Sequence, residues 1–547
     1  MPIALIFPSH YGVGMSNLGF QLVYDQINHH PDLVCERVFL PEPGGRALSV
    51  ESSRPLADFP ILMTALSFEQ NLPDLVGMLL ASGIEPLVAK RRSEKIGPGT
   101  PLIIAGGVAC FINPEPLAPF VEAILIGEAE ELLPPLLEKL VSGGDRSALL
   151  AELVEMVGCY VPQYYDFHYG ENGVLTEIVA RDGAPVRVRR QAWRGGEEAG
   201  HSRLLSPAAE FADLFLVELG RGCSRSCRFC AAGFVYRPPR LWTSEVINRA
   251  LDRRPEGINR VGLLGMEMAR AEDLQAVAER LLAEGCRLSF SSLRADALTP
   301  ELLRLLAGSG LKSVAIAPDG GSERLRRVIN KGISREVVLD AATRLVTAGI
   351  VNLKLYFMIG LPTETEDDLA EMLVLVKEVR EIMNIPGRAR GRLANLTLSI
   401  NPMVPKAWTP LQYHPFVEPN LLMKKFDFLR HGLRGVDNLK IMGEKPTNAY
   451  LQATLARGDR RLAPALIEYA ARGGNWQQVF RKCGVAPEDY ALRARGRDEL
   501  LPWEIIDQGM DKNYLWHEYG KALEARTSPV CEVDGCRRCG VCGGQGA

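Results

Sequence analysis

The chain has 547 residues, of which 47% are hydrophobic and 24% charged, and its formal net charge is −3. This composition excludes a largely disordered chain and a polycationic protein that coats nucleic acid. No run approaches the about 18 consecutive apolar residues of a membrane span, and the N-terminus lacks the basic start and the cleavage site of a signal peptide. We therefore expect a multidomain cytoplasmic protein that has no contact with membranes.

Residues 1–142 are predicted to form a Rossmann-like, doubly wound parallel sheet of the α/β class. Short, nearly all-apolar runs alternate here with amphipathic helical segments, which is typical of strands buried on both faces. Ligands of such sheets bind at the carboxyl ends of the strands, where glycines stand in this sequence. The runs cover residues 3–7, 36–40, 61–66, 102–107 and 123–128.

The rest of the chain divides into three segments. Residues 143–210 are polar and rich in Arg and Gly, which predicts a hairpin and a linker. Residues 211–415 return to strand–helix alternation and predict a (β/α)6-type partial barrel with catalytic groups at the C-terminal strand ends. Residues 416–547 are predicted to form a mostly helical region with a cysteine-rich tail. The six barrel strands are expected at residues 214–219, 260–265, 287–293, 313–318, 352–360 and 396–402.

A first cysteine loop (residues 220–230) follows the expected strand 214–219 and contains Cys223, Cys227 and Cys230. Three thiolates can hold three irons of a 4Fe–4S cube and leave the fourth iron open to a substrate. A structural zinc ion would need a fourth ligand nearby, and no further cysteine follows before Cys286. The loop therefore favours a catalytic iron–sulfur cluster.

The C-x3-C-x2-C spacing, with an aromatic residue before the last cysteine, resembles the radical S-adenosylmethionine (SAM) superfamily. In that family SAM chelates the open iron, and one electron cleaves it to methionine and a 5′-deoxyadenosyl radical. Polar segments at successive predicted strand ends match the family's SAM contacts in order. The resemblance implies that SAM is bound by Phe229, Gly265, Glu267, Ser291, Arg294, Asp319, Ile359 and Gly360.

A Rossmann-like domain in front of such a barrel resembles the cobalamin-binding radical SAM proteins. The D-x-H-x-x-G segment that supplies a cobalt-ligating histidine in other cobalamin proteins is missing, so we expect no protein ligand below the cobalt. The alternative is a structural lobe without a cofactor. The resemblance implies that cobalamin is contacted by Gly12, Gly14, Ser67, Gly106, Gly107, Gly127 and Glu128.

A second cysteine loop (residues 531–542) contains Cys531, Cys536, Cys539 and Cys542 with the spacing C-x4-C-x2-C-x2-C. Consecutive x2 spacings are close to a ferredoxin-type run and favour an auxiliary 4Fe–4S cluster. Structural zinc and a tail of free thiols remain alternatives. A cluster in this place has a catalytic role only if the loop docks on a folded domain. The region 401–547 resembles a branch of the cobalamin-domain radical SAM proteins, from which we carry over no substrate.

Arginine-rich runs near residues 324–327, 388–392 and 457–461 are interpreted as solvated faces. The alternative is a groove for RNA, in which Trp408, Tyr413, Trp503 and Trp516 would stack on bases. The expected protein partner is an electron donor such as flavodoxin or ferredoxin.

The sequence thus predicts a cobalamin-dependent radical SAM enzyme, a methyltransferase that acts on an unactivated carbon or phosphorus centre. A second hypothesis is radical rearrangement, cyclisation or sulfur insertion with help from the second cysteine loop. A third is a cobalamin- or SAM-responsive binding protein associated with RNA. The sequence predicts neither a catalytic acid or base nor the substrate.

Overall fold

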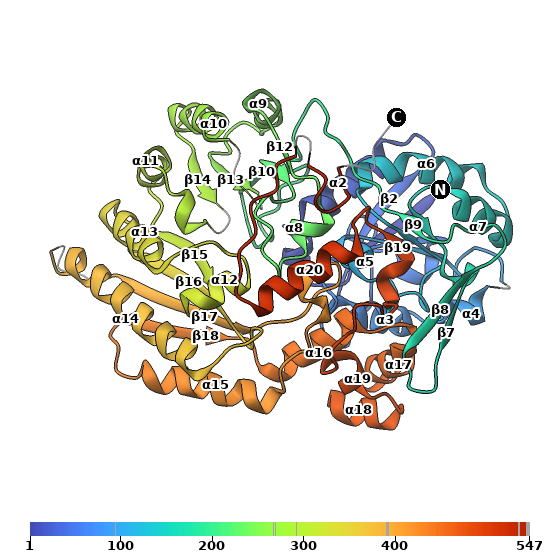
Figure 1. Ribbon diagram of the computed structural model, residues 1–547. Helices are drawn as coiled ribbons and strands as arrows, with labels where there is room; N and C mark the ends of the chain where they lie inside the picture. The colour runs from blue at the N-terminus through green and yellow to red at the C-terminus, as the bar shows by residue number, and fades with distance from the viewer. Residues whose placement is uncertain are drawn as a thin grey trace.

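The computed structural model describes residues 1–92, 94–265, 267, 270–290, 293–389, 393–533 and 536–542. The N-terminal sheet (blue) lies on one side of the molecule and the barrel (green to orange) on the other (Figure 1). Helix α20 (Lys512–Leu523), in red, crosses the front between them. No helix within these ranges is long and apolar enough to cross a membrane.

The N-terminal sheet has the strand order β2-β1-β3-β4-β5-β6. The first five strands are parallel and β6 is antiparallel to β5. This is the flavodoxin-like doubly wound order with an added edge strand, so the predicted parallel sheet is confirmed. The strands are β1 (Pro2–Phe7), β2 (Val34–Phe39), β3 (Ile61–Ala65), β4 (Leu102–Gly106), β5 (Ala123–Leu125) and β6 (Cys159–Tyr160).

Both faces of this sheet are buried, as the near-continuous apolar strands require. On β1, Ile3, Leu5 and Phe7 belong to the core that packs under α2, α6 and α7, while Ala4 and Ile6 belong to the opposite core. That opposite core also contains residues of the C-terminal helices, so the two ends of the chain share one interior. The helices are α1 (Tyr11–Gly14), α2 (Leu18–His29), α3 (Asn71–Ala81), α4 (Val88–Arg91), α5 (Val108–Ile112), α6 (Ala129–Ser142) and α7 (Arg146–Glu155).

The segment after this sheet contains the predicted hairpin, formed by β7 (Tyr165–Tyr169) and β8 (Leu175–Ala180). It then contributes β9 (Val188–Arg189), which pairs in parallel with β19 (Ile506–Asp507) of the C-terminal region. The linker is therefore fixed to the C-terminal part of the molecule.

The barrel strands run parallel in the order β10-β13-β14 and β15-β16-β17-β18, and a bridge from Leu293 to Ile316 joins the two groups. All six expected strands are present, and β18 adds a seventh within the region predicted to be mostly helical. The strands are β10 (Phe215–Glu218), β13 (Arg260–Leu264), β14 (Arg287–Phe290), β15 (Ser313–Asp319), β16 (Asn352–Ile359), β17 (Asn395–Pro402) and β18 (Leu439–Gly443), with the short pair β11 (Gly220–Arg221) and β12 (Arg240–Leu241).

Helices cover the outside of the barrel, because their leucines and valines form one core with the strands. These helices are α9 (Ser244–Asp252), α10 (Ala271–Ala283), α11 (Pro300–Gly308), α13 (Arg335–Thr347), α14 (Glu366–Ala389) and α15 (Pro419–Gly432). The buried apolar residues of α8 (Ala232–Val235) and α12 (Glu323–Val328) belong to two other cores.

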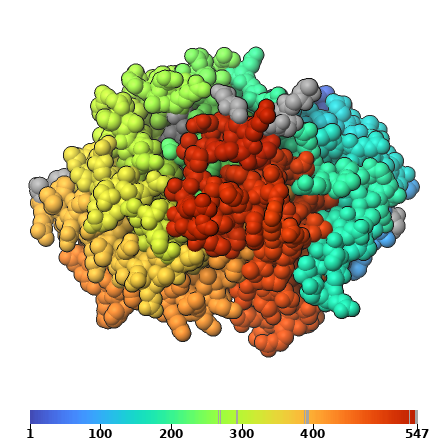
Figure 2. All heavy atoms as spheres, viewed as in Figure 1, coloured from blue at the N-terminus to red at the C-terminus, as the bar shows by residue number. Residues whose placement is uncertain are grey.

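The C-terminal helices fill the junction between the barrel and the N-terminal sheet. Helix α17 packs on α3, and α20 contacts both α12 and the 3-10 turn η4 (Pro410–Tyr413). In the space-filling view the red C-terminal residues cover the surface between the barrel and the linker (Figure 2). The remaining helices are α16 (Pro446–Arg457), α17 (Ala463–Arg472), α18 (Trp476–Lys482) and α19 (Pro487–Ala491).

Candidate functional site

The first cysteine loop begins directly after β10 and is shaped by two glycines. Gly220 and Gly222 have φ angles of 156° and 81°, in the region that favours glycine. A Cβ on Gly222 would lie 2.5 Å from the carbonyl oxygen of Tyr236, and one on Gly220 would collide with the Arg240 carbonyl. The backbone therefore fixes where the loop starts.

The loop is tied to the segment after β15 by backbone and side-chain hydrogen bonds. Asn330 Nδ2 donates to the Ser226 carbonyl at 3.2 Å, and the Arg228 amide donates to the Ile329 carbonyl at 2.9 Å. The Arg228 guanidinium is fully buried and pairs with Glu518 of α20 at 3.1 Å. These contacts hold the loop between the barrel and the C-terminal region.

The three thiols of this loop lie at the barrel mouth, where Cys227 is buried and Cys223 and Cys230 are half-buried. Burial raises the pKa of all three, that of Cys223 to about 12, while Lys331 and Arg294 oppose the shift at Cys227. Nη1 of Arg294 lies 4.0 Å from the Cys227 sulfur. Thiols that are costly to ionise alone become thiolates when a metal binds, and these two cations stabilise the resulting charge.

Glu267 binds the loop itself. Its carboxylate accepts hydrogen bonds from the Ser224 amide and the Ser224 hydroxyl, both at 2.7 Å, and lies 3.6 Å from Arg225 Nε. A Cβ on Gly265 would approach the Glu267 carbonyl to 2.5 Å, so the turn after β13 requires glycine there. The segment predicted to hold the SAM amine therefore also fixes the loop next to Cys223.

A cavity of about 600 Å³ opens beside this loop. Gly265, Glu267 and Arg294, three of the predicted SAM residues, line it together with Arg225. Ser291 lies outside the described residues. A cavity that contacts both the cysteine loop and these polar strand ends fits a ligand with amino and carboxylate groups.

The other predicted SAM residues lie elsewhere in the barrel and are absent from the described lining of this cavity. Phe229 packs half-buried on the core next to α12. Asp319 is buried and its carboxylate is 2.6 Å from Lys331 Nζ. Ile359 belongs to the barrel core, and Gly360 has a φ of 78°. The structure thus gives these four residues packing or ion-pair roles.

A second cavity, of about 300 Å³, lies at the carboxyl edge of the N-terminal sheet. Its inner part is an apolar slot between α2 and α6, and its mouth faces the end of β10. Five of the predicted cobalamin residues line it, namely Ser67, Gly106, Gly107, Gly127 and Glu128. The apolar part of the lining includes Leu5, Leu18, Leu22, Met63, Ile104 and Leu133.

The three predicted glycines that line this cavity differ in what an added Cβ would contact. A Cβ on Gly107 would lie 2.5 Å from the Leu66 carbonyl, and one on Gly127 would collide with the backbone of Gln191. A Cβ on Gly106 meets nothing nearer than 3.9 Å. Close packing of neighbouring segments therefore explains two of them, and Gly106 alone leaves room for a bound molecule.

Gly12 and Gly14 were predicted as cobalamin contacts, and the structure does not support this. Both lie in α1, outside the described lining of the cavity. A Cβ on Gly14 would collide with the ring of Phe39, and one on Gly12 would lie 3.1 Å from the Ala208 carbonyl. These glycines allow α1 to pack closely on the sheet and on the linker.

The mouth of this cavity is a buried ion-pair network that reaches the first cysteine loop. Glu128, which lines the cavity, pairs with Arg240 at 2.7 Å and Arg221 at 2.8 Å. Arg221 also pairs with Glu130 at 2.6 Å and Glu218 at 2.8 Å, and it stands two residues before Cys223. Oε2 of Glu218 is buried without a hydrogen-bond partner among the described residues. The mouth therefore offers a polar acceptor to a ligand.

His201 is a cavity residue that the sequence analysis missed. It is 4% exposed, lines the cavity and lies 3.0 Å from the Ala199 carbonyl through Nδ1. Burial lowers its pKa, so the ring is neutral at pH 7, with Nδ1 as the donor and Nε2 as the acceptor. No motif marks His201, because only the pairing of the linker with β10 brings it to the cavity.

The second cysteine loop docks directly on the first. The Cys531 amide donates to the Ser224 carbonyl at 2.7 Å, and the Asp511 amide donates to the Cys539 carbonyl at 2.9 Å. Among the described residues, no three His, Cys, Asp or Glu side chains are close enough to share a single metal ion. A cube binds each thiolate at a separate iron, so its ligands need not converge on one point.

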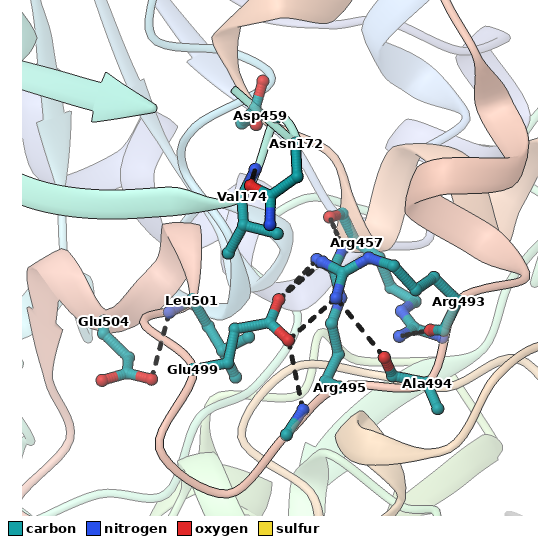
Figure 3. Close-up of polar contacts among 12 residues, drawn as sticks. Asn172, Val174, Arg457, Asp459, Arg493, Ala494, Arg495, Glu499, Leu501 and Glu504 are labelled. Carbon is teal, nitrogen blue, oxygen red and sulfur yellow. Dashed lines mark hydrogen bonds and ion pairs between the residues drawn. The ribbon is translucent and has the colours of Figure 1, made fainter. Parts of the chain in front are cut away.

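The arginines of the run at 457–461 support the fold. Arg457 is fully buried and donates to the Arg493 and Ala491 carbonyls, at 2.7 and 3.1 Å. Next to it, Arg493 and Arg495 enclose Glu499 (Figure 3). Burial opposes ionisation of Glu499, but these two arginines lower its pKa to about 2. Arg457 therefore does not lie on a solvated face, whereas Arg461 at the end of the run is exposed.

The aromatic residues proposed for RNA stacking do not form an exposed platform. Trp408, Tyr413 and Trp503 are at most 3% exposed, and Trp503 Nε1 donates to Gln412 at 3.0 Å. Trp516 packs edge-on against Tyr413. Because three of the four side chains are core residues, this part of the RNA hypothesis is wrong.

Two family models match the chain: "Radical SAM proteins, N-terminal" covers residues 19–162, and "Radical SAM superfamily" covers residues 217–376. With the parallel barrel and the cysteine loop at its mouth, these matches define the class of protein as a radical SAM enzyme. The chain belongs to the radical SAM superfamily, and its N-terminal domain and C-terminal region flank the matched barrel.

The relatives by sequence are of two kinds. "Uncharacterized protein MJ0966" of Methanocaldococcus jannaschii is 25% identical over 469 residues, which are 85% of this chain and 90% of that protein. The tRNA-2-methylthio-N(6)-dimethylallyladenosine synthase of Sorangium cellulosum is 31% identical over 194 residues. That match spans 30% of this chain and 38% of the synthase.

Among solved structures, the radical S-adenosylmethionine methyltransferase TsrM from Kitasatospora setae has a TM-score of 0.53 with 12% sequence identity. The likeness covers 88% of this chain and 99% of TsrM. It shows that the two proteins share a fold over nearly the whole length of both.

Proposed function

We propose that this radical SAM enzyme is a cobalamin-dependent methyltransferase that acts on an unactivated centre. The observation that carries the proposal is that the cavity of the N-terminal sheet and the first cysteine loop lie next to each other at Arg221. This residue lines the cavity and stands two residues from Cys223. An enzyme that uses two cofactors on one substrate needs them side by side. TsrM, which has this fold, is a methyltransferase.

The residues present fit both cofactors. Cys223, Cys227 and Cys230 supply three sulfur ligands, and Arg294 stabilises their charge. The apolar slot between α2 and α6 suits an aromatic nucleotide tail, and the unpartnered Oε2 of Glu218 suits an amide donor. When bound, the cluster would supply the electron that cleaves SAM, and cobalamin would supply a transferable methyl group.

The protein's own contribution is positioning and exclusion of water. Glu267 holds Ser224 and thereby fixes Cys223 beside the 600 Å³ cavity. The network of Glu128 and Arg221 fixes the mouth of the sheet cavity against the same loop. Neutral His201 at this mouth offers Nε2 as an acceptor for a proton or a hydrogen bond.

The test is a metal count and a spectrum on protein purified without oxygen and supplied with cobalamin. We expect about one cobalt per chain, together with SAM cleavage to 5′-deoxyadenosine when the protein is reduced. The Gly106→Val variant, whose side chain would enter the cavity, should lose cobalt and keep its iron. Gly77→Val is the matched control, because a Cβ there meets nothing within 4 Å. Wild-type protein without cobalt would refute the proposal.

A second candidate function is insertion of a methylthio group into an RNA base. The observation that favours it is the likeness to the tRNA-2-methylthio-N(6)-dimethylallyladenosine synthases, although the chain spans only 38% of the Sorangium cellulosum enzyme. Product masses separate the two candidates, because methylation adds one methyl group while methylthiolation also adds sulfur. Activity in protein that binds no cobalt would favour the second candidate.

A further inference from the structure

We propose that the second cysteine loop holds a second 4Fe–4S cluster and that this cluster passes electrons to the first cysteine loop. The electron path rests on the proposed function, since it needs a reducible cluster at the first loop. The second metal site does not, because its thiols and its docking are independent of SAM cleavage.

The four thiols of the second loop form a set with an inner and an outer side. Cys531 and Cys539 are 9% and 3% exposed, whereas Cys536 and Cys542 are half-buried. The run from Cys536 to Cys542 has the x2 spacing of ferredoxins, while zinc sites usually separate two C-x2-C pairs by a dozen residues or more.

One connection between the loops is made by backbone alone. The Cys531 amide donates to the Ser224 carbonyl at 2.7 Å, and Ser224 is the residue after Cys223. A few residues earlier, the Ser528 amide donates to Asn330 Oδ1 at 2.8 Å. Asn330 in turn holds the first loop, so the tail is anchored to the same support that fixes the first cysteines.

A second connection runs through Arg237. Its guanidinium is 2% exposed and donates to Ser226 Oγ at 2.7 Å. Burial opposes its charge, but Tyr514 and Cys539 lie close enough to raise the pKa of Arg237. Ser226 is the residue before Cys227. Each connection therefore begins at a cysteine of the second loop and ends one residue from a cysteine of the first. A cation between the two loops also offsets the negative charge of two thiolate-bound clusters.

The positions of the thiols suit electron transfer from a donor protein to the second loop and from there to the first loop. Cys536 and Cys542 are the more exposed thiols, which a donor protein can approach. Cys531 and Cys539 are buried, and the backbone of Cys531 contacts the first loop. The donor is an iron–sulfur or flavin protein in its reduced form, which loses one electron. The second cluster gains that electron and then loses it to the first, and no bond forms or breaks in either transfer.

The first experiment counts metals in the full chain after anaerobic reconstitution with iron and sulfide. We expect about eight irons in the wild type, about four in Cys536→Ser/Cys542→Ser, and about eight in the control Cys483→Ser. Cys483 is also half-buried but lies at the end of α18. About four irons with about one zinc in the wild type would overturn the proposal, and so would eight irons in the double variant.

The second experiment measures the path. Freeze-quench electron paramagnetic resonance should follow reduction of the first cluster by reduced ferredoxin or flavodoxin. We expect the double variant to be at least about tenfold slower, and titanium(III) citrate to restore SAM cleavage to the wild-type level. Equal rates with the protein donor, or cleavage that the chemical reductant does not restore, would overturn the relay.

A third measurement needs no variant, so a folding defect cannot obscure it. Two reduced clusters this close should broaden each other's resonance in fully reduced wild type, and the broadening should be absent when only one is reduced. Two independent, unbroadened signals would overturn the electron path. If the wild type holds eight irons with coupled signals but does not cleave SAM, the proposed function fails and the second metal site stands.

Discussion

The two cysteine loops are positioned by different structural means. The first is determined by the barrel, because it follows β10 and begins with Gly220 and Gly222, whose φ angles favour glycine. The second contains no strand in its described residues, 531–533 and 536–542, and depends on contacts such as Cys531 to Ser224 and Asp511 to Cys539. A change in the backbone of the first loop should therefore spread to the second, whereas loss of a single thiol in either loop should remain local.

The largest effect is expected from Cys227→Ala, which removes the most buried thiol of the first loop. SAM cleavage should fall to the background rate, while the second loop retains about four irons. Iron analysis with a 5′-deoxyadenosine assay checks this, and Cys286→Ala, another buried cysteine of the barrel, is the control. Complete loss of iron would show that the second loop cannot load by itself.

The next effect concerns the buried pair between the loop and α20. Arg228→Met removes one of the two cations that pair with buried Glu518 and leaves Lys521, so it should reduce the free energy of unfolding by about 2 kcal/mol. Denaturant unfolding measures this change. The double variant Arg228→Met/Glu518→Gln should recover part of the loss, because the charge that has lost this cation is removed. Equal losses in both variants would contradict an electrostatic cause.

A matched pair of glycine variants tests whether backbone geometry determines the first loop. Gly222→Ala and Gly257→Ala both place Ala at a φ near 80°, but only the former collides with a backbone atom, the Tyr236 carbonyl. We expect Gly257→Ala to cost about 1 kcal/mol and Gly222→Ala about 2 kcal/mol more. Thermal unfolding of both compares them, and similar values would contradict the packing argument.

The smallest expected effect is a pH dependence of the free energy of unfolding, caused by His414 next to α20. Burial, with Arg457 nearby, lowers the pKa of His414 to about 4, and His414 contacts Tyr519 of α20. Between pH 6.5 and pH 4 the unfolded chain protonates this histidine more readily than the folded protein does. The folded state is therefore favoured most above pH 6.5, and its stability falls as the pH decreases toward 4. At pH 5.5 the loss is about 1 kcal/mol. His414→Gln should flatten this part of the stability curve, measured by unfolding from pH 7 to 5.

The sequence predicted those parts of the fold that repeat a simple pattern. Alternating apolar runs and helices predicted both parallel sheets, and the cysteine spacing predicted the first loop. Strand β18 was missed because its residues, Leu439–Gly443, are half-buried or exposed at the barrel edge and lack an apolar run. A strand that is partly exposed to solvent carries no continuous apolar run, so a search for such runs does not detect it.

The candidate site was predicted less completely, because side chains can meet by tertiary pairing alone. The strand-end position of Glu128 predicted its place at the cavity, but not its ion pairs with Arg221 and Arg240, which come from the barrel. Buried Arg457 looked like a surface charge because its carbonyl acceptors come from the region near residue 491. His201 reaches its cavity through a pairing with Val217 that no local pattern shows.

The contact between Arg228 and Ser528 joins positions that are 300 residues apart in the chain. Contacts across such a separation form late, because a long loop must close first, whereas the glycine-shaped first loop forms from neighbouring strands. During synthesis the first three cysteines therefore stay open on one side until the last segment arrives. Assembly of this protein then has a built-in order, in which the first metal centre can be loaded from outside and the tail closes over it afterwards.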